Sequence, residues 1–233
     1  MIFQKDNKRV LSEQKFLIKL ARFFGYVPID IAHSFSNTEF NDFGIDIYCG
    51  RQGSGKTVSM VDKLDYYRRY YPKCQIFTNF GYKHETGQLI DWQQLLNITN
   101  GVDGVVFAID EIHNEFDLYD AKGFNTDLLR LISMQRKQHI KILGTAQVYS
   151  DVNIKLRRQT FKVIDCYTIF RRWTFQKAFD ALEYNRVVDN PEKKAKLKRL
   201  WRKNLVQNAR FRDSFDSSLV IDNMKALKKR QNY

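Results

Sequence analysis

The amino-acid sequence predicts an α/β fold in which helices flank a mostly parallel β-sheet. Short apolar runs suited to buried strands alternate with segments whose apolar residues recur at helical spacing. At one junction, residues 44–64, the sequence GIDIYCGRQGSGKTVSMVDKL joins a strand to a helix through a glycine-rich turn. Strands that are separated by helices pair in parallel through right-handed crossovers.

Each expected element follows from a local pattern. Residues 12–24 are expected to form an N-terminal helix, because apolar residues recur at helical spacing between Ser12 and Gly25. Residues 26–43 are an irregular connection. The next elements are strand 45–49, helix 56–71, strand 75–79, loop 80–90, short helix 91–98, strand 104–109, helix 125–137 and strand 140–145. We expect a further strand at 161–166 and another over 167–176.

The chain has 233 residues, of which 43% are hydrophobic, enough for one domain with a substantial core and an appendage. The sequence divides into an N-terminal helix and connection (1–43), a central α/β core (44–166) and a small basic C-terminal region (167–233). Three widely spaced cysteines in no metal-type pattern indicate free thiols in a reducing compartment. The N-terminus lacks the layout of a signal peptide, and no run of about 18 apolar residues spans a membrane. These features predict a cytoplasmic protein without stable membrane insertion.

The charge is concentrated near the C-terminus. The formal net charge of +13 favours a polyanionic partner, and residues 191–233 hold 13 Lys and Arg against 4 Asp and Glu. In PEKKAKLKRLWRKNLVQNARFRDSF, residues 191–215, leucines and Trp201 recur at helical spacing. We therefore expect a basic amphipathic helix that docks on DNA, on a structural RNA or on a neighbouring subunit, although charge runs are often only solvated surface.

The glycine-rich turn fits the pattern G-x-x-x-x-G-K-[ST]. Its glycines let backbone N–H groups curve around phosphate oxygens, and the following helix adds its positive end. Lys56 is expected to reach the β- and γ-phosphates, and the Thr57 hydroxyl to ligate Mg²⁺. The nucleotide contacts would come from Gly50, Arg51, Gln52, Gly53, Ser54, Gly55, Lys56, Thr57 and Val58. The alternative is a chance match between a glycine turn and a helix start.

The second candidate element is GVVFAIDEIHNEF, an apolar strand that ends in Asp110 and Glu111. Asp110 at the strand end would hold the Mg²⁺ beside the glycine loop, and Glu111 would polarise the attacking water. An adjacent Asp-Glu pair is also common at solvated strand ends. The two motifs together predict hydrolysis of ATP.

These motifs resemble those of P-loop ATPases with an additional strand between the phosphate loop and the acidic strand. The resemblance implies a sensor of the γ-phosphate at Thr145 or Gln147, at the end of KILGTAQ (141–147). In ring-shaped DNA pumps of the FtsK/HerA kind, an arginine of a neighbouring subunit completes the active site. Arg136 is the candidate for that role, with Arg130, Arg157 and Arg158 as rivals; the alternative for Arg136 is a cation that satisfies the helix's negative end.

Within this class, the chain most resembles the genome-packaging ATPases of small tailed bacteriophages, over roughly residues 44–165. The resemblance rests on the order of the motifs, the acidic strand and the Arg/Lys-ended helix before the sensor strand. It implies a homo-oligomeric ring, a pentamer or hexamer, that pumps double-stranded DNA into a procapsid in the host cytoplasm. A portal or a structural RNA would contact the basic C-terminal region. No nuclease activity is expected, because residues 167–233 lack an acidic metal-binding cluster.

Two alternatives stay open. The segment TNFGY (78–82) and the spacing of the motifs also resemble the ATPase domain of filamentous-phage assembly and zonula-occludens-toxin-like proteins, which carry a membrane-spanning helix. The other alternative is a nucleotide-dependent switch that binds DNA and hydrolyses slowly.

Sequence-independent contacts with DNA phosphates are expected from glycine-flanked loops in a translocating ring. The candidates are Lys83 and His84 in residues 81–88, and Lys122 in residues 119–125. Each loop could equally be solvated surface.

Overall fold

The computed structural model describes residues 24–25, 27–28, 39–90, 93–114 and 136–216. The chain divides into two units, residues 1–38 and 39–233, and the sheet belongs to the second. Its elements are β1 (Gly44–Cys49), α3 (Lys56–Tyr70), β2 (Gln75–Thr78), β3 (Gly87–Gln88), α4 (Gln93–Asn97), β4 (Val105–Ile109), β5 (Ile140–Ala146), α7 (Ile154–Arg157), β6 (Thr160–Ile169), β7 (Trp173–Asp180), α8 (Ala181–Asn185), α9 (Pro191–Ala195), β8 (Trp201–Val206) and α10 (Ala209–Arg212).

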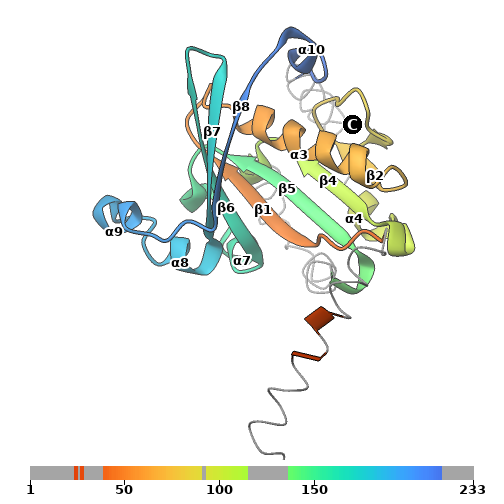
Figure 1. Ribbon diagram of the computed structural model, residues 1–233, viewed down its shortest axis with the longest axis horizontal. Helices are drawn as coiled ribbons and strands as arrows, with labels where there is room; N and C mark the ends of the chain where they lie inside the picture. Colours follow the sequence, from red (N-terminus) through yellow and green to blue (C-terminus); the bar gives the residue numbers. More distant parts are fainter. Residues whose placement is uncertain (1–23, 26, 29–38, 91–92, 115–135, 217–233) are drawn as a thin grey trace, which may run out of the picture. The chain divides into compact units, whose positions relative to one another are not determined.

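The described strands form one sheet in the order β3-β2-β4-β5-β1-β6-β7-β8 (Figure 1). Neighbouring strands from β3 to β6 pair in parallel, whereas β6, β7 and β8 pair antiparallel. The predicted α/β class with a mostly parallel sheet is confirmed. The carboxyl ends of β1, β4 and β5 meet at one edge of the sheet, where open α/β sheets bind their ligands.

Apolar side chains cover both faces of the sheet. Ile45 and Ile47 of β1 lie in one buried cluster, together with Tyr184 of α8. Tyr48 points to the opposite face and packs in a second cluster with Met60 and other residues of α3. Burial on both faces explains why the central strands read as nearly continuous apolar runs.

A buried ion cluster lies at the amino ends of β1 and β5. The ammonium of Lys141, whose side chain is 0% exposed, lies 3.1 Å from Asp42 and 2.9 Å from Asp46. Lys63 contacts Asp42 at 3.1 Å, and the Tyr67 hydroxyl donates to it at 2.6 Å. Burial alone would raise the pKa of Asp42, but the two ammonium groups and the hydrogen bonds hold it well below its usual range.

The sequence located most of the early elements to within two residues. The loop predicted at 80–90 also contains the two-residue strand β3. The predicted strand over 167–176 is wrong, because that stretch contains a turn: β6 runs on to Ile169, and β7 begins at Trp173. Phe170 and Arg171 form the turn with φ of 49° and 55°. Neither residue type favours positive φ, so the usual glycine or asparagine signal is missing.

The predicted basic amphipathic helix over 191–215 is also wrong. The segment instead contains two short helices, α9 (Pro191–Ala195) and α10 (Ala209–Arg212), and between them Trp201–Val206 form strand β8 on the edge of β7. Pairing with an available strand edge outweighed the helical spacing of the apolar residues. The boundary at residue 166 stays a prediction, while β7 and β8 extend the sheet that the earlier strands begin.

Some predictions lie outside the described residues. The N-terminal helix at 12–24 falls there except for its last residue, and so does most of the helix at 125–137. Among the described residues, no helix combines the length and hydrophobicity needed to cross a bilayer. The three cysteines are buried free thiols.

Candidate nucleotide site

The glycine loop between β1 and α3 lies directly against β6 and β7. Gly55 has φ of +85°, and a Cβ there would lie 2.5 Å from the Thr168 hydroxyl oxygen. At Gly50, with φ of +149°, a Cβ would lie 2.6 Å from the carbonyl oxygen of Cys166. Both positions therefore require glycine for conformation and for space.

Helix α3 starts at the end of this loop, so its first N–H groups face the space that the loop encloses. Lys56 is 7% exposed, and its ammonium lies 3.5 Å from the Arg51 carbonyl oxygen. The Thr57 hydroxyl oxygen lies 3.1 Å and 3.3 Å from the two carboxylate oxygens of Asp110. Hydroxyl and carboxylate oxygens are the donors that Mg²⁺ prefers, so this pair fits the predicted metal site.

Asp110 is held at the end of β4 by two neighbouring strands. The side-chain amide of Asn79, which follows β2, accepts from the Asp110 backbone N at 2.7 Å and donates to its carbonyl oxygen at 3.1 Å. The Thr145 hydroxyl of β5 donates to the Asp110 carboxylate and accepts from the Glu111 backbone N at 2.9 Å. Asn79 was not predicted as a site residue, although a polar residue at the carboxyl end of a parallel strand is the signal that could have found it.

Glu111 adopts a left-handed conformation with φ of 52°, which is uncommon for a glutamate and often marks a functional position. Its carboxylate lies 3.3 Å from Nε2 of His113. Thr145 thus connects the two acidic residues, with its hydroxyl oxygen bonded to the Asp110 carboxylate and to the Glu111 backbone. His113 is a further residue at the site that sequence reasoning did not assign to it.

A directed chain of hydrogen bonds supports the glycine loop from the C-terminal strands. The Thr168 hydroxyl donates to the Ser54 carbonyl oxygen at 2.9 Å, so it must accept from the Thr174 hydroxyl at 2.8 Å. The Thr174 oxygen in turn accepts from Gln207 Nε2 at 2.9 Å, and Gln207 Oε1 accepts from Arg212 at 3.1 Å. Residues after β8 therefore reach the glycine loop through the hydroxyl groups of Thr174 and Thr168.

The remaining predicted residues are placed differently. Gln147 has an exposed side chain and only its carbonyl oxygen reaches the loop, accepting from Gly50 N at 3.3 Å. Thr145 is therefore the sensor candidate that contacts the acidic pair. Arg51 and Gln52 are exposed, and Val58 is half-buried. The roles of all these residues stay predictions.

Among the described residues, the arginine candidates Arg136, Arg157 and Arg158 make no hydrogen bond or ion pair with the glycine loop of their own chain. Arg136 precedes β5, at the opposite edge of the sheet, and its guanidinium carbon lies 5.8 Å from the ring centre of Phe43. Arg157 donates to Asn185 at 3.0 Å, and Arg158 is exposed. Arg130 lies outside the described residues.

The loop of residues 81–88 is more firmly held than expected for a mobile DNA contact. The backbone N of Lys83 donates to Ser214 at 2.8 Å, and the His84 carbonyl oxygen accepts from Arg68 at 2.6 Å. The side chains of Lys83 and His84 are exposed. Lys122 lies outside the described residues.

Known structures share this fold. The sequence matches no protein-family model and no curated protein. The N-terminal domain of zonular occludens toxin from Neisseria meningitidis superposes with a TM-score of 0.54 at 17% identity, over 74% of this chain and 98% of that one. The genome-packaging NTPase B204 of Sulfolobus turreted icosahedral virus 2, in complex with ATP-gammaS, gives 0.44 at 12% identity over 60% and 93%. EssC ATPases 2 and 3 from Geobacillus thermodenitrificans give 0.39 at 18% over 54% and 32%.

The first of these likenesses establishes the fold, and the two with lower scores add no argument. The match with a TM-score of 0.54 confirms the predicted fold, an α/β fold with a mostly parallel sheet.

Proposed function

We propose that this chain is a Mg²⁺-dependent ATPase of the viral packaging or assembly type, which works as a homo-oligomer and couples ATP hydrolysis to movement of DNA. The contact between Thr57 and Asp110 carries the proposal. It brings the end of the glycine loop within 3.1 Å of the acidic end of β4, 53 positions later in the sequence. A glycine loop without the carboxylate would bind phosphate, whereas the two together hold a nucleotide and its metal.

The side chains divide the chemistry among them. Backbone N–H groups of the loop and the Lys56 ammonium bind the phosphate oxygens. Thr57 and Asp110 would hold Mg²⁺, which neutralises phosphate charge when bound. Glu111 accepts the proton of the attacking water, and Thr145 fixes its backbone relative to Asp110.

The variant Glu111→Gln tests this assignment. The amide keeps the shape of the side chain but cannot accept the proton, so we expect ATP binding to persist while hydrolysis falls about 100-fold or more. ATP-dependent thermal shift and phosphate release measure the two quantities. Glu183→Gln, an exposed glutamate of α8, is the matched control. A Glu111→Gln protein with the wild-type rate would exclude Glu111 as the base.

Two candidate functions follow from this proposal: packaging of double-stranded DNA and assembly of a filamentous phage. Genome packaging of double-stranded DNA, with a ring of five or six subunits in the host cytoplasm and transiently at the procapsid, is supported by the motif order and the net charge of +13. A zonula-occludens-toxin-like role in filamentous-phage assembly is favoured by the fold match, which covers 98% of the Neisseria domain. Stimulation of ATP hydrolysis by duplex DNA supports packaging, whereas flotation of the protein with membranes supports the assembly role.

A further inference from the structure

The antiparallel strands β6, β7 and β8 present an ordered face to solvent. Their register places three side chains, one from each strand, in each of three rows. We call this surface the aromatic face; it comprises Asp165, Tyr167, Ile169, Trp173, Phe175, Lys177, Arg202, Asn204 and Val206.

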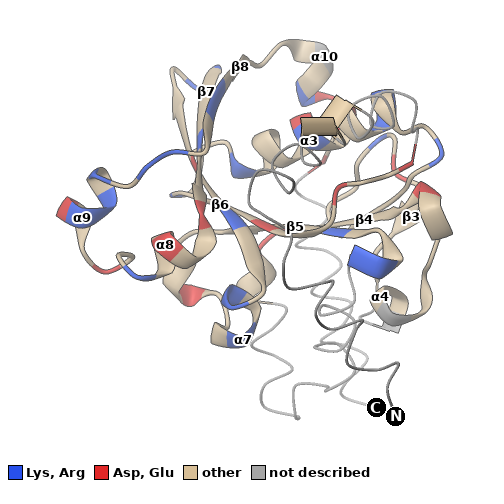
Figure 2. Ribbon diagram, turned by 60° about the horizontal axis from the view of Figure 1, so that its bottom comes forward, with Lys and Arg blue, Asp and Glu red and all other residues tan. Residues whose placement is uncertain are grey.

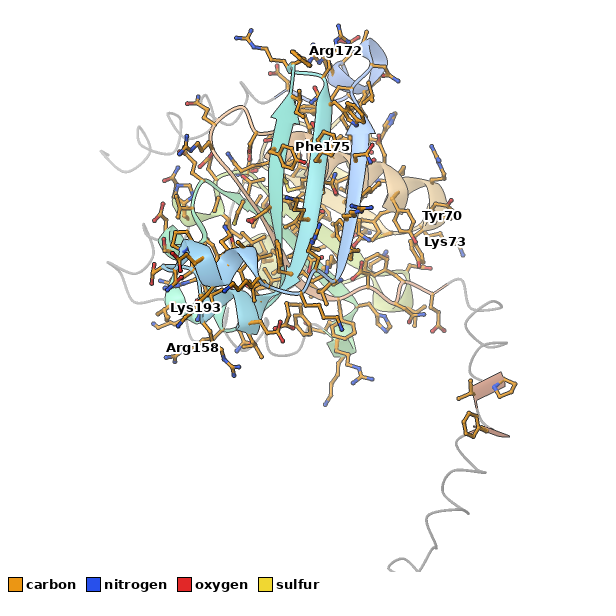
Figure 3. The ribbon with its side chains drawn as sticks, turned by 60° about the vertical axis from the view of Figure 1, so that its left-hand side comes forward. Tyr70, Lys73, Arg158, Arg172, Phe175 and Lys193 are labelled. Carbon is orange, nitrogen blue, oxygen red and sulfur yellow. The ribbon has the colours of Figure 1, made fainter. Side chains whose placement is uncertain are left out.

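Nothing in the described structure covers this face. The opposite side of the same strands carries Thr168 and Thr174, which support the glycine loop, and α8 covers only the end of β6 and β7 near Phe179. Figure 3 looks onto these strands, with Phe175 on β7 and Arg172 at the turn. Trp173 remains 45% exposed and Tyr167 remains 42% exposed.

The rings of the aromatic face are held in fixed positions. Tyr167 and Phe175 stack at 4.9 Å with 8° between their planes, and Trp173 continues the row at 4.9 Å from Phe175. The Trp173 indole N–H donates to Asn204 at 3.0 Å, and the Lys177 ammonium lies 5.3 Å from the ring centre of Tyr167. Rings that are already ordered lose little conformational entropy when a ligand contacts them.

The surroundings of this face are strongly cationic. Residues 166–179 and 193–212 contain 12 Lys and Arg and no Asp or Glu. Figure 2 shows these cations along β8 and the segment that leads into it. Asp165, in register with Lys177, is already paired with Lys194 at 3.1 Å and accepts from the Tyr184 hydroxyl at 2.7 Å.

The turn adds a further exposed ring. Phe170 is 92% exposed, and it is held at positive φ between β6 and β7. The backbone N of Arg172 closes the turn by donating to the Ile169 carbonyl oxygen at 3.1 Å. Phe170 therefore adds exposed apolar surface beside the cations at the end of the aromatic face.

We propose that the aromatic face binds single-stranded nucleic acid. Unpaired bases offer π-faces that stack on exposed rings, and their phosphates suit a surface of cations without free carboxylates. A duplex hides its base faces, so it would use the cations and leave the rings unused. A second copy of this chain that presented the same face would meet like charges. The inference goes beyond the proposed function, because it requires neither a nucleotide nor a ring of subunits.

The test is a fluorescence anisotropy titration of the full chain without nucleotide, so that an inactive ATP site would not alter the result. The probes are labelled dT20, rU20 and a mixed-sequence 20-base-pair duplex at two salt concentrations. The variants Trp173→Leu and Phe175→Leu keep apolar bulk but remove the stacking rings, and Lys177→Gln removes one cation. Tyr70→Leu, an exposed aromatic of α3 labelled in Figure 3, is the matched control. Circular dichroism and gel filtration verify that each variant is folded and has the wild-type oligomeric state.

We expect each ring variant to bind dT20 or rU20 about 5- to 150-fold more weakly, with duplex binding and the Tyr70→Leu control unchanged. Lys177→Gln should lower the slope of log K against log salt by about 0.7 for each lost phosphate contact. A higher affinity for dT20 or for rU20 would show whether the aromatic face favours single-stranded DNA or RNA. Unchanged single-strand affinity in folded ring variants, or no binding at all, would overturn the proposal. Loss of oligomers in the ring variants would instead identify a protein interface and would overturn it too.

Discussion

The chain of hydrogen bonds that supports the glycine loop leads to a prediction for Thr174→Val. Valine keeps the volume of this fully buried side chain but removes the hydroxyl that accepts from Gln207 at 2.9 Å and donates to Thr168 at 2.8 Å. Gln207 is 6% exposed, so water cannot readily replace the lost acceptor. An unsatisfied buried donor costs about 1–3 kcal/mol, and the lost bond to Thr168 adds about 1 kcal/mol.

We therefore expect Thr174→Val to lower the free energy of unfolding by about 2–4 kcal/mol. For a chain of this length that corresponds to a fall in Tm of about 4–16 °C. Urea denaturation followed by circular dichroism measures the effect, with Mg-ATP affinity as a second readout because Thr168 holds the Ser54 carbonyl oxygen.

A double-mutant cycle with Thr168→Val provides the control. Both substitutions interrupt the same chain, so their effects should be clearly less than additive. If the free energy of unfolding of Thr174→Val lies within about 0.5 kcal/mol of wild type, this chain of hydrogen bonds does not stabilise the fold.

Three further predictions concern separate sites. Lys56→Ala should abolish the thermal shift produced by Mg-ATP, since its ammonium is the cation buried beside the glycine loop; a normal shift would contradict the phosphate site. If the chain works as the proposed homo-oligomer, Arg136→Ala should stop turnover with nucleotide affinity nearly unchanged, because Arg136 lies at the opposite edge of its own sheet; an unchanged rate would exclude Arg136 as the arginine that completes a neighbour's site. Asp42 has a lowered pKa in the folded protein, so its contribution to stability is present above its unfolded value of about 4 and is lost as the pH falls below that value. In urea titrations at pH 3–7, Asp42→Asn should reduce the fall in the free energy of unfolding at low pH. An equally steep fall in the variant would show that other groups cause it.

Candidate site residues could be located from the sequence where the chemistry requires a fixed local pattern. The glycine loop with Lys56 and Thr57 is contiguous, and Asp110 follows a buried strand, so both could be located without coordinates. Thr145 was one of two candidates, and the structure places it rather than the Gln147 side chain against the acidic pair.

The support of the loop could not be read from the sequence. Thr168 lies 114 positions from Ser54, and no periodicity marks two threonines that meet across a hairpin. The hairpin itself was obscured because Phe170 and Arg171 turn the chain without glycine or asparagine. Strand β8 was mistaken for a helix because the free edge of β7, which decides its conformation, is a tertiary feature.

The position of the last strands has a consequence for synthesis on the ribosome. The glycine loop emerges early, but the hydroxyl of Thr168 and the side chains that orient it, as far as Arg212, follow roughly 110–160 residues later. At about 5–20 residues per second, the nascent chain waits on the order of 8–30 s before the loop gains its support. During that interval the glycine loop of the growing polypeptide lacks the hydrogen bond that Thr168 donates to Ser54.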